Sequence, residues 1–309
     1  MSCKVVLDTT GRLHPGDTLY GRVVCNVTSN QCVREIRCKL VGKEQTIIKS
    51  AKDTFEAQNE FLIVKMTLIG EVTLEPRQHE YPFCFTLPKN IPSTLEMEFG
   101  CIKYCVKATV DIPYSFDYVD EITLPVEVPV DFNNIQDELQ LKPITFSNEK
   151  TVCCLCCTGG EISMNLQLEK NGFILGEIAK VQIEVKNMSR VNIEQIMLTL
   201  TRIWDYKSEG RKERIKEIMA TETETGTDAH TQRTYLIQFK IPQEISIHNL
   251  VKCILIKETF RLRAEVLLPL THRDLVVDAI VKLGHIPLKY STHKDKLLLP
   301  SSLEEPSKD

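Results

Sequence analysis

The chain has 309 residues, of which 42% are hydrophobic and 26% are charged. These fractions are ordinary for a soluble globular protein and exclude a disordered or fibrous chain. The formal net charge of −4 at pH 7 offers no basic surplus for nucleic acid, and the length favours about two domains.

The amino-terminal segment, Met1-Ser2-Cys3-Lys4, is not followed by an apolar stretch typical of a signal peptide. No run approaches the roughly 18 apolar residues that a membrane-spanning helix needs. We therefore expect a cytoplasmic protein, recruited at most to the plasma membrane or endosomes, in which the 12 cysteines stay reduced.

Apolar and polar residues alternate through the first half of the chain, which is typical of strands with one buried face. After the turn at Gly16, Ile36 and Leu40 lie on the apolar side of one such strand. A later strand buries alternate residues, which are Ile102, Tyr104, Val106, Ala108 and Val110. Strands at short, regular spacing predict an all-β sandwich or barrel.

Four outward-facing cations belong to these two strands, namely Arg37, Lys39, Lys103 and Lys107. If the strands are sheet neighbours, the cations form a basic face that can bind phosphorylated tails or anionic lipid headgroups. The alternative is a solvated sheet surface, on which lysine is common.

A polar segment, residues 131–152, predicts a linker between a first domain at 1–130 and a second at 153–290. Cys153, Cys154, Cys156 and Cys157 follow it directly. Four thiolates within five residues cannot easily surround one metal ion, so metal binding is the weaker interpretation. Acylation of exposed thiols and a purely structural strand edge remain as alternatives.

The second half repeats the first in three blocks, in the same order. Gly176, Ile196 and Leu200 follow the spacing of Gly16, Ile36 and Leu40, with an offset of 160 residues. Phe239-Lys240-Ile241-Pro242 matches Phe85-Thr86-Leu87-Pro88, and the alternation at 260–266 matches that at 104–110. A repeat this long exceeds a solenoid unit of about 20–50 residues and predicts two domains of equal topology.

No pattern predicts a catalytic, cofactor or metal site. His272-Arg273-Asp274-Leu275 copies part of a kinase catalytic loop, but position 279 is Ala where magnesium binding needs Asn, and no glycine-rich loop occurs. The segment lies between two predicted strands, which favours a polar hairpin turn.

The charged tail, residues 291–309, is predicted to be disordered.

Several segments resemble the arrestin family, of the α-arrestin type. They include 15–21, 33–42, 81–88, 91–93 and 104–110 for its first domain, and 153–160, 171–173 and 283–287 for its second. The resemblance implies two seven-stranded, immunoglobulin-like β-sandwiches in tandem. It also implies a non-enzymatic adaptor that binds cytoplasmic tails of receptors or transporters and regulates endocytic sorting, protein transport or signalling.

Many α-arrestins recruit ubiquitin ligases through P-P-x-Y motifs. This sequence has none, and the nearest match is Pro287-Leu288-Lys289-Tyr290, which keeps one of the two prolines. This departure from the motif argues against direct recruitment of a ligase through a WW domain. The alternatives to a cargo adaptor are a retromer-like sorting subunit and, from another class, a metal-dependent or transferase enzyme.

Overall fold

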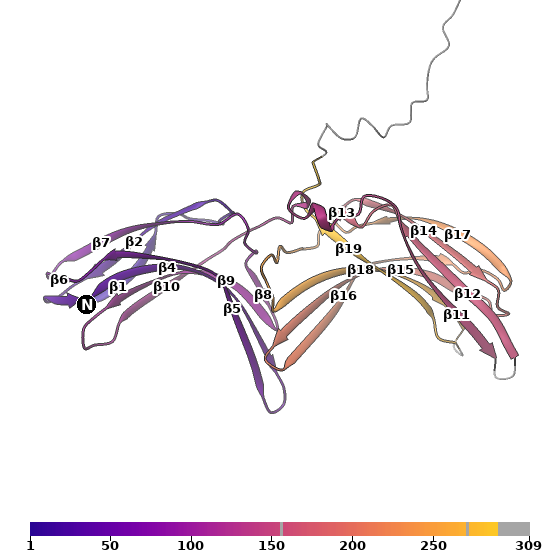
Figure 1. The fold of residues 1–309 in the computed structure, drawn as a ribbon, viewed down its shortest axis with the longest axis horizontal. Coiled ribbons are helices and arrows are strands. Elements are labelled where there is room, and N and C mark those ends of the chain that lie inside the picture. The colour runs from indigo at the N-terminus through magenta and orange to yellow at the C-terminus, as the bar shows by residue number, and fades with distance from the viewer. Residues whose placement is uncertain (155–156, 270–271, 290–309) are drawn as a thin grey trace, which may run out of the picture.

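The computed structural model describes residues 1–154, 157–269 and 272–289. Two β-sandwiches lie side by side along the long axis of the molecule, β1–β10 forming the first and β11–β19 the second (Figure 1). The predicted all-β fold with tandem sandwiches is confirmed. No helix in these ranges is long and apolar enough to cross a membrane.

In the first sandwich a three-stranded sheet, β1-β2-β7, faces the sheet β10-β9-β4-β5, to which β8 adds beside β9. A small pair, β3-β6, completes it. The strands are β1 (Ser2–Leu7), β2 (Thr18–Asn26), β3 (Gln31–Val33), β4 (Glu35–Lys49), β5 (Thr54–Ile69), β6 (Val72–Leu74), β7 (Gln78–Thr86), β8 (Leu95–Met97), β9 (Gly100–Asp111) and β10 (Tyr118–Leu124).

In the second sandwich the sheet β11-β12-β14-β17 faces the sheet β13-β19-β18-β15-β16. Its strands are β11 (Ile144–Cys154), β12 (Cys157–Leu168), β13 (Gly172–Ile174), β14 (Ile178–Asn187), β15 (Gln195–Ser208), β16 (Arg211–Thr225), β17 (Thr231–Lys240), β18 (Ile256–Leu267) and β19 (Leu275–Gly284). Within the described ranges each sandwich therefore has more strands than the seven that the resemblance implies.

One sheet of each sandwich has the same strand order, as the sequence repeat predicts. The order β10-β9-β4-β5 in the first corresponds to β19-β18-β15-β16 in the second. Even the register is shared, because Ile36 pairs with Val110 as Ile196 pairs with Val266. The predicted core residues Ile36, Leu40, Ile196 and Leu200 are all fully buried.

The expected linker, residues 131–152, contains regular secondary structure. Two 3-10 helices, η1 (Phe132–Asn134) and η2 (Gln136–Glu138), occupy its start, but β11 begins at Ile144 and pairs with β12. The segment is polar because β11 is an edge strand, so most of its side chains are solvated. Of the described apolar side chains of β11, Ile144 and Phe146 are half-buried and Val152 is buried. The predicted tail lies outside the described residues.

The second sandwich contributes directly to the core of the first. Trp204, Tyr206 and Ile256, at the ends of β15 and β18, pack into the hydrophobic cluster of the first sandwich. Polar contacts join the same region, since Thr46 Oγ1 donates to the Lys207 carbonyl at 2.6 Å and Ser93 N donates to the Asn249 carbonyl at 2.9 Å. The two sandwiches thus share a packed and hydrogen-bonded interface.

Candidate partner-binding surface

The predicted basic residues lie on two strands that are indeed neighbours. β4 and β9 pair antiparallel, with Lys39 directly opposite Lys107 and Arg37 opposite Thr109. Residues directly opposite each other on paired strands have Cβ atoms about 4.5–5.5 Å apart and point to the same face. Lys39 and Lys107 are therefore brought together on the outer face of the first sandwich.

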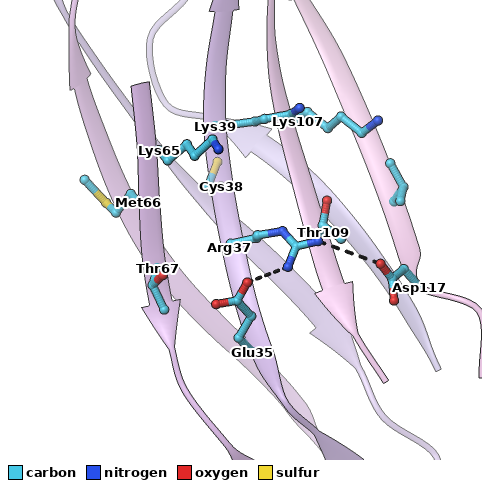
Figure 2. A pocket seen from close by; sticks show the side chains of 11 residues that line it. Glu35, Arg37, Cys38, Lys39, Lys65, Met66, Thr67, Lys107, Thr109 and Asp117 are labelled. Atoms are coloured by element: carbon cyan, nitrogen blue, oxygen red, sulfur yellow. Dashed lines mark hydrogen bonds and ion pairs between the residues drawn. The ribbon is translucent and has the colours of Figure 1, made fainter. Parts of the chain in front are cut away.

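A third lysine, which the sequence analysis did not identify, extends this pair. Lys65 on β5 lies opposite Lys39, so Lys65, Lys39 and Lys107 cross three adjacent strands as one row, here called the lysine row (Figure 2). Within the described residues, none of the three has a carboxylate within 4.0 Å. Like charges that lie directly opposite each other on paired strands destabilise a sheet. A negatively charged group next to this row relieves the repulsion between the lysines.

The lysine row borders a shallow depression of about 560 Å³ on the outer sheet face. The other side chains of its wall include Thr67, Thr109 and Val119 from β5, β9 and β10. Hydroxyl groups and ammonium groups both donate hydrogen bonds, and such donors suit phosphate or carboxylate oxygens. The arrangement can hold an anion, and nothing in this depression resembles a catalytic pair.

Arg37 stands at one end of the depression but is already engaged by acidic neighbours. Its guanidinium lies 2.5 Å from a Glu35 oxygen and 3.8 Å from Asp117 (Figure 2). A third carboxylate, that of Asp111, lies 3.9 Å away. The hydrogen bond that Arg37 donates to Glu35 raises the pKa of Arg37 further above its ordinary value. These carboxylates compensate the charge of Arg37, so it contributes less to an anion site than the lysines do.

Lys103 lies apart from the other three predicted residues. It faces Lys43 across β4 and β9, four residue pairs away from Lys39 and Lys107 along the strands. Its ammonium group lies 2.9 Å from a Glu96 carboxylate oxygen and does not border the depression. The structure therefore brings together only Lys39, Lys107 and, at the edge, Arg37.

An apolar pair separates the lysines along the strands. Val41 and Cys105 face outward between the pairs Lys39–Lys107 and Lys43–Lys103, yet both are buried. The aliphatic stems of lysine can cover such groups while the ammonium stays in water. Burial raises the pKa of the Cys105 thiol to about 11, so this cysteine is a protonated packing residue at neutral pH.

The hairpin between β9 and β10 carries a second feature that the sequence analysis missed. Tyr114 and Phe116 at its tip are essentially fully exposed, at 106% and 95%. The signal in the sequence was Pro113, which ends the alternating pattern and places the following aromatic residues in a turn. Exposed aromatics of this kind are enriched at binding surfaces.

The cysteine cluster lies at the β11–β12 hairpin. Cys153 and Cys154 end β11 and Cys157 begins β12, with Cys154 paired to Cys157 in the backbone register. Cys156 and the side chains of the other three lie outside the described residues. Acylation and the structural alternative both stay predictions.

The kinase-like tripeptide lies in the connection between β18 and β19, which pair antiparallel as predicted for a hairpin. Asp274 Oδ1 accepts a hydrogen bond from Leu268 N at 2.9 Å, so its carboxylate organises this connection. In the described ranges no three His, Cys, Asp or Glu side chains gather in a way that could hold a metal ion.

Comparison with known families supports the resemblance read from the sequence. The family model described as "Arrestin (or S-antigen), N-terminal domain" matches residues 3–133, and the model for the C-terminal domain matches residues 158–288. The chain belongs to the arrestin family. The first matched range covers the strands of the first sandwich, and the second covers those of the second sandwich except β11, which precedes it.

Relatives of this arrestin include several arrestin domain-containing proteins. Arrestin domain-containing protein 4 of Mus musculus is 23% identical over 91% of this chain and 70% of its own length. The human protein of the same name is 24% identical over 88% and 68% of the two chains. Arrestin domain-containing protein 17 of Caenorhabditis elegans is 24% identical over 88% and 67%. These similarities extend over most of the arrestin fold and support an adaptor role.

Pro287 and Lys289, in the segment nearest to a P-P-x-Y motif, are held by this arrestin's own linker, and Tyr290 lies outside the described residues. The Asn133 side chain donates to the Pro287 carbonyl at 3.0 Å and accepts from Lys289 N at 2.8 Å. β19 ends at Gly284, so Pro287 follows the last strand instead of lying in it. A segment held by these two hydrogen bonds must be released before it can bind as an extended polyproline ligand.

Proposed function

We propose that this arrestin is a non-enzymatic cytoplasmic adaptor that binds acidic or phosphorylated segments in the cytoplasmic regions of membrane proteins. Through such binding it influences the endocytic sorting, transport or signalling of receptors or transporters. The family supports the adaptor role, and the lysine row supports the chemistry of the bound segment. No catalytic step and no cofactor is part of the proposal.

The observation that carries the proposal is the lysine row of Lys65, Lys39 and Lys107. Three cations on adjacent strands, in a protein with a net charge of −4, concentrate positive potential on one small area. A phosphate group offers three acceptor oxygens to such donors, and a lysine acts on it as a mobile point charge. An extended peptide lying across the strands therefore has a partner for a phosphate at this row.

The test measures binding of phosphorylated receptor-tail peptides to the wild type and to the Lys39→Glu, Lys65→Glu, Lys107→Glu variant. We expect the affinity to fall about tenfold or more, because three attractive charges become repulsive. Binding by the wild type should also weaken with salt, since the Debye length shortens from about 10 Å at 0.1 M to about 3 Å at 1 M.

A charge-matched control changes Lys180, Lys186 and Lys240 to Glu on exposed positions of the second sandwich. This control alters the net charge equally and should keep the affinity of the wild type. Equal binding by both triple variants contradicts the assignment. A parallel measurement on anionic vesicles separates the sources of phosphate, because loss of vesicle binding alone would identify a lipid surface in place of a peptide site.

A further inference from the structure

Two cysteines of the first sandwich meet across the pair of strands that opens the chain. Cys3 on β1 lies directly opposite Cys25 on β2, and their sulfur atoms are 2.6 Å apart. Both are free thiols. In the ranges that the structure describes, no other cysteine is hydrogen-bonded to a second one.

The backbone geometry suits a covalent bond between these residues. Directly opposite residues of an antiparallel pair have Cα atoms about 4.5 or 5.5 Å apart, inside the range of about 4.4–6.8 Å found for disulfides. A bond between Cys3 and Cys25 therefore needs no movement of either strand. The sulfur contact already brings the two atoms closer than an ordinary non-bonded sulfur pair.

The two thiols differ in their access to solvent. Cys25 is fully buried on the core face of β2, whereas Cys3, near the start of β1, is only partly buried against the same core. A reagent from solution thus reaches Cys3 first, with Cys25 behind it as the second nucleophile. A more accessible thiol next to a resolving cysteine is one of the features of redox-sensitive pairs.

We propose that Cys3 and Cys25 form a reversible disulfide when the protein meets a low-molecular-weight disulfide such as oxidised glutathione. The Cys3 thiolate attacks one sulfur of glutathione disulfide, which forms a mixed disulfide and releases one glutathione thiolate. The Cys25 thiolate then attacks the Cys3 sulfur, which forms the protein disulfide and releases the second glutathione. The two protein thiols lose two electrons and two protons, and the two glutathione molecules take them up.

The bond would hold an edge strand to the rest of its sheet. β1 pairs only with β2 and forms the outer strand of the sheet β1-β2-β7. Its other support includes a hydrogen bond of 2.7 Å from Val5 N to the Asp120 carboxylate of β10. Edge and terminal strands open locally more easily than central ones, and a covalent link removes this freedom. The disulfide therefore makes the stability of β1 dependent on the redox state.

The test equilibrates the full chain in glutathione buffers of increasing oxidation and maps the products by peptide mass spectrometry. We expect a disulfide that links the peptides of Cys3 and Cys25, and its loss on return to reducing buffer. In the Cys25→Ala variant the second step is impossible, so Cys3 should accumulate as the glutathione adduct. In the Cys3→Ser variant no adduct should form at the buried Cys25.

Two controls distinguish the reaction of the Cys3–Cys25 pair from reactions of other cysteines. Cys84 is exposed and has no cysteine opposite it, so in the same wild-type samples it should carry only a removable glutathione. A background with Cys153, Cys154, Cys156 and Cys157 replaced by Ser excludes exchange with the cluster at the β11–β12 hairpin. Hydrogen exchange of the β1 amides should slow on oxidation in this background, and Cys3→Ser should abolish the effect.

The proposal is overturned if Cys3 collects glutathione in the wild type as it does in Cys25→Ala, because the second thiol then does not react. It is also overturned if Cys3 stays fully alkylatable at the redox poise that modifies Cys84. If the disulfide forms but β1 exchange is unchanged, its claimed effect on the edge strand is wrong.

Discussion

Glu44 shows how a single residue can join the two sandwiches. Its side chain is completely buried on β4, and its carboxylate accepts hydrogen bonds from three consecutive backbone N–H groups of the second sandwich. These donors are Ile254 at 2.7 Å, Leu255 at 3.1 Å and Ile256 at 3.3 Å, and Asn59 Nδ2 adds a fourth bond at 2.8 Å. A buried carboxylate is tolerable only when it is satisfied in this way.

We expect Glu44→Ala to lower the free energy of unfolding by about 2–4 kcal/mol, because the three N–H groups lose their acceptor inside the interface. Chemical denaturation monitored by circular dichroism measures the change. Glu60→Ala, on the exposed side of β5, removes the same group from a solvated position and should change stability by less than about 0.5 kcal/mol. Equal effects of the two substitutions would contradict the role assigned to Glu44.

His285 makes the junction between the linker and the second sandwich sensitive to pH. Its Nδ1 accepts a hydrogen bond from Val130 N at 3.0 Å, which requires that this nitrogen be unprotonated. Burial and the nearby His248 lower the pKa of His285 from its ordinary value near 6.5, while Glu127 and Glu258 oppose the shift. The unfolded chain therefore binds a proton at this histidine more readily than the folded protein does.

Because the folded pKa is the lower one, the wild type should lose stability as the pH falls below about 6.5. The slope from this one group is at most about 1.4 kcal/mol per pH unit. His285→Asn keeps an acceptor near the position of Nδ1 but does not titrate, so this part of the pH dependence should disappear. The measurement is the midpoint of thermal unfolding of both proteins between pH 5 and pH 8. If the two midpoints depend on pH in the same way, His285 is not the source of the pH dependence.

At the scale of elements, β4 and β15 are the central strands around which each sandwich is organised. Each pairs with a long hairpin partner on one side and with a core strand on the other, in the orders β9-β4-β5 and β18-β15-β16. Leu40 and Leu200 occupy equivalent positions on them, opposite Val106 and Leu262. Both leucines are fully buried, so each has no room to relax.

Leu40→Ala and Leu200→Ala should each destabilise the sandwich that contains them by roughly 2–5 kcal/mol, through lost burial and the cavity left behind. Hydrogen exchange read separately for the two halves measures which sandwich is affected. Ile280→Ala serves as a control, because that side chain is 51% exposed on β19. Unchanged protection in the half carrying a leucine variant would be inconsistent with the strand register described above.

For the whole molecule, the linker acts as an anchored connection between the sandwiches. Phe132 in η1 is buried against Gly172 and Gly284 of the second sandwich, where a Cβ at Gly284 would collide with its ring. Backbone bonds between Val130, Phe132 and the segment His285–Ile286 hold the same place. The start of the linker therefore packs as part of the second sandwich.

Gly284→Ala should displace Phe132 and destabilise this contact by about 1–3 kcal/mol, as overpacking of a filled site does. We expect limited proteolysis to cut between residues 131 and 143 faster in this variant than in the wild type. Gly70→Ala provides the matched control, since nothing lies within 4 Å of a Cβ there. A wild-type cleavage rate in Gly284→Ala would mean that Phe132 does not anchor the linker.

Patterns in the sequence were enough to predict the class of fold, the two repeated units and the inward-facing residues. These properties follow from local alternation and from repetition, which can be read in the sequence without knowing how the strands pair. Ile36, Leu40, Ile196 and Leu200 were predicted to be buried because the period of a strand is two, wherever its neighbours lie. The outward direction of Lys39 and Lys107 followed from the same rule.

The pairing of strands in the folded protein is needed to show which outward-facing residues meet and which polar segment forms the edge of a sheet. Lys65 joins Lys39 because β5 pairs with β4, and no spacing in the sequence encodes that register. Asp117, in the connection between β9 and β10, compensates the charge of Arg37. Glu96, on β8 beside β9, compensates the charge of Lys103. The polar strand β11 was taken for linker because an edge strand needs few buried side chains, and Cys3 meets Cys25 only through the pairing of β1 with β2. Pairing between strands is a long-range choice made by the packed core, so it is absent from local sequence patterns.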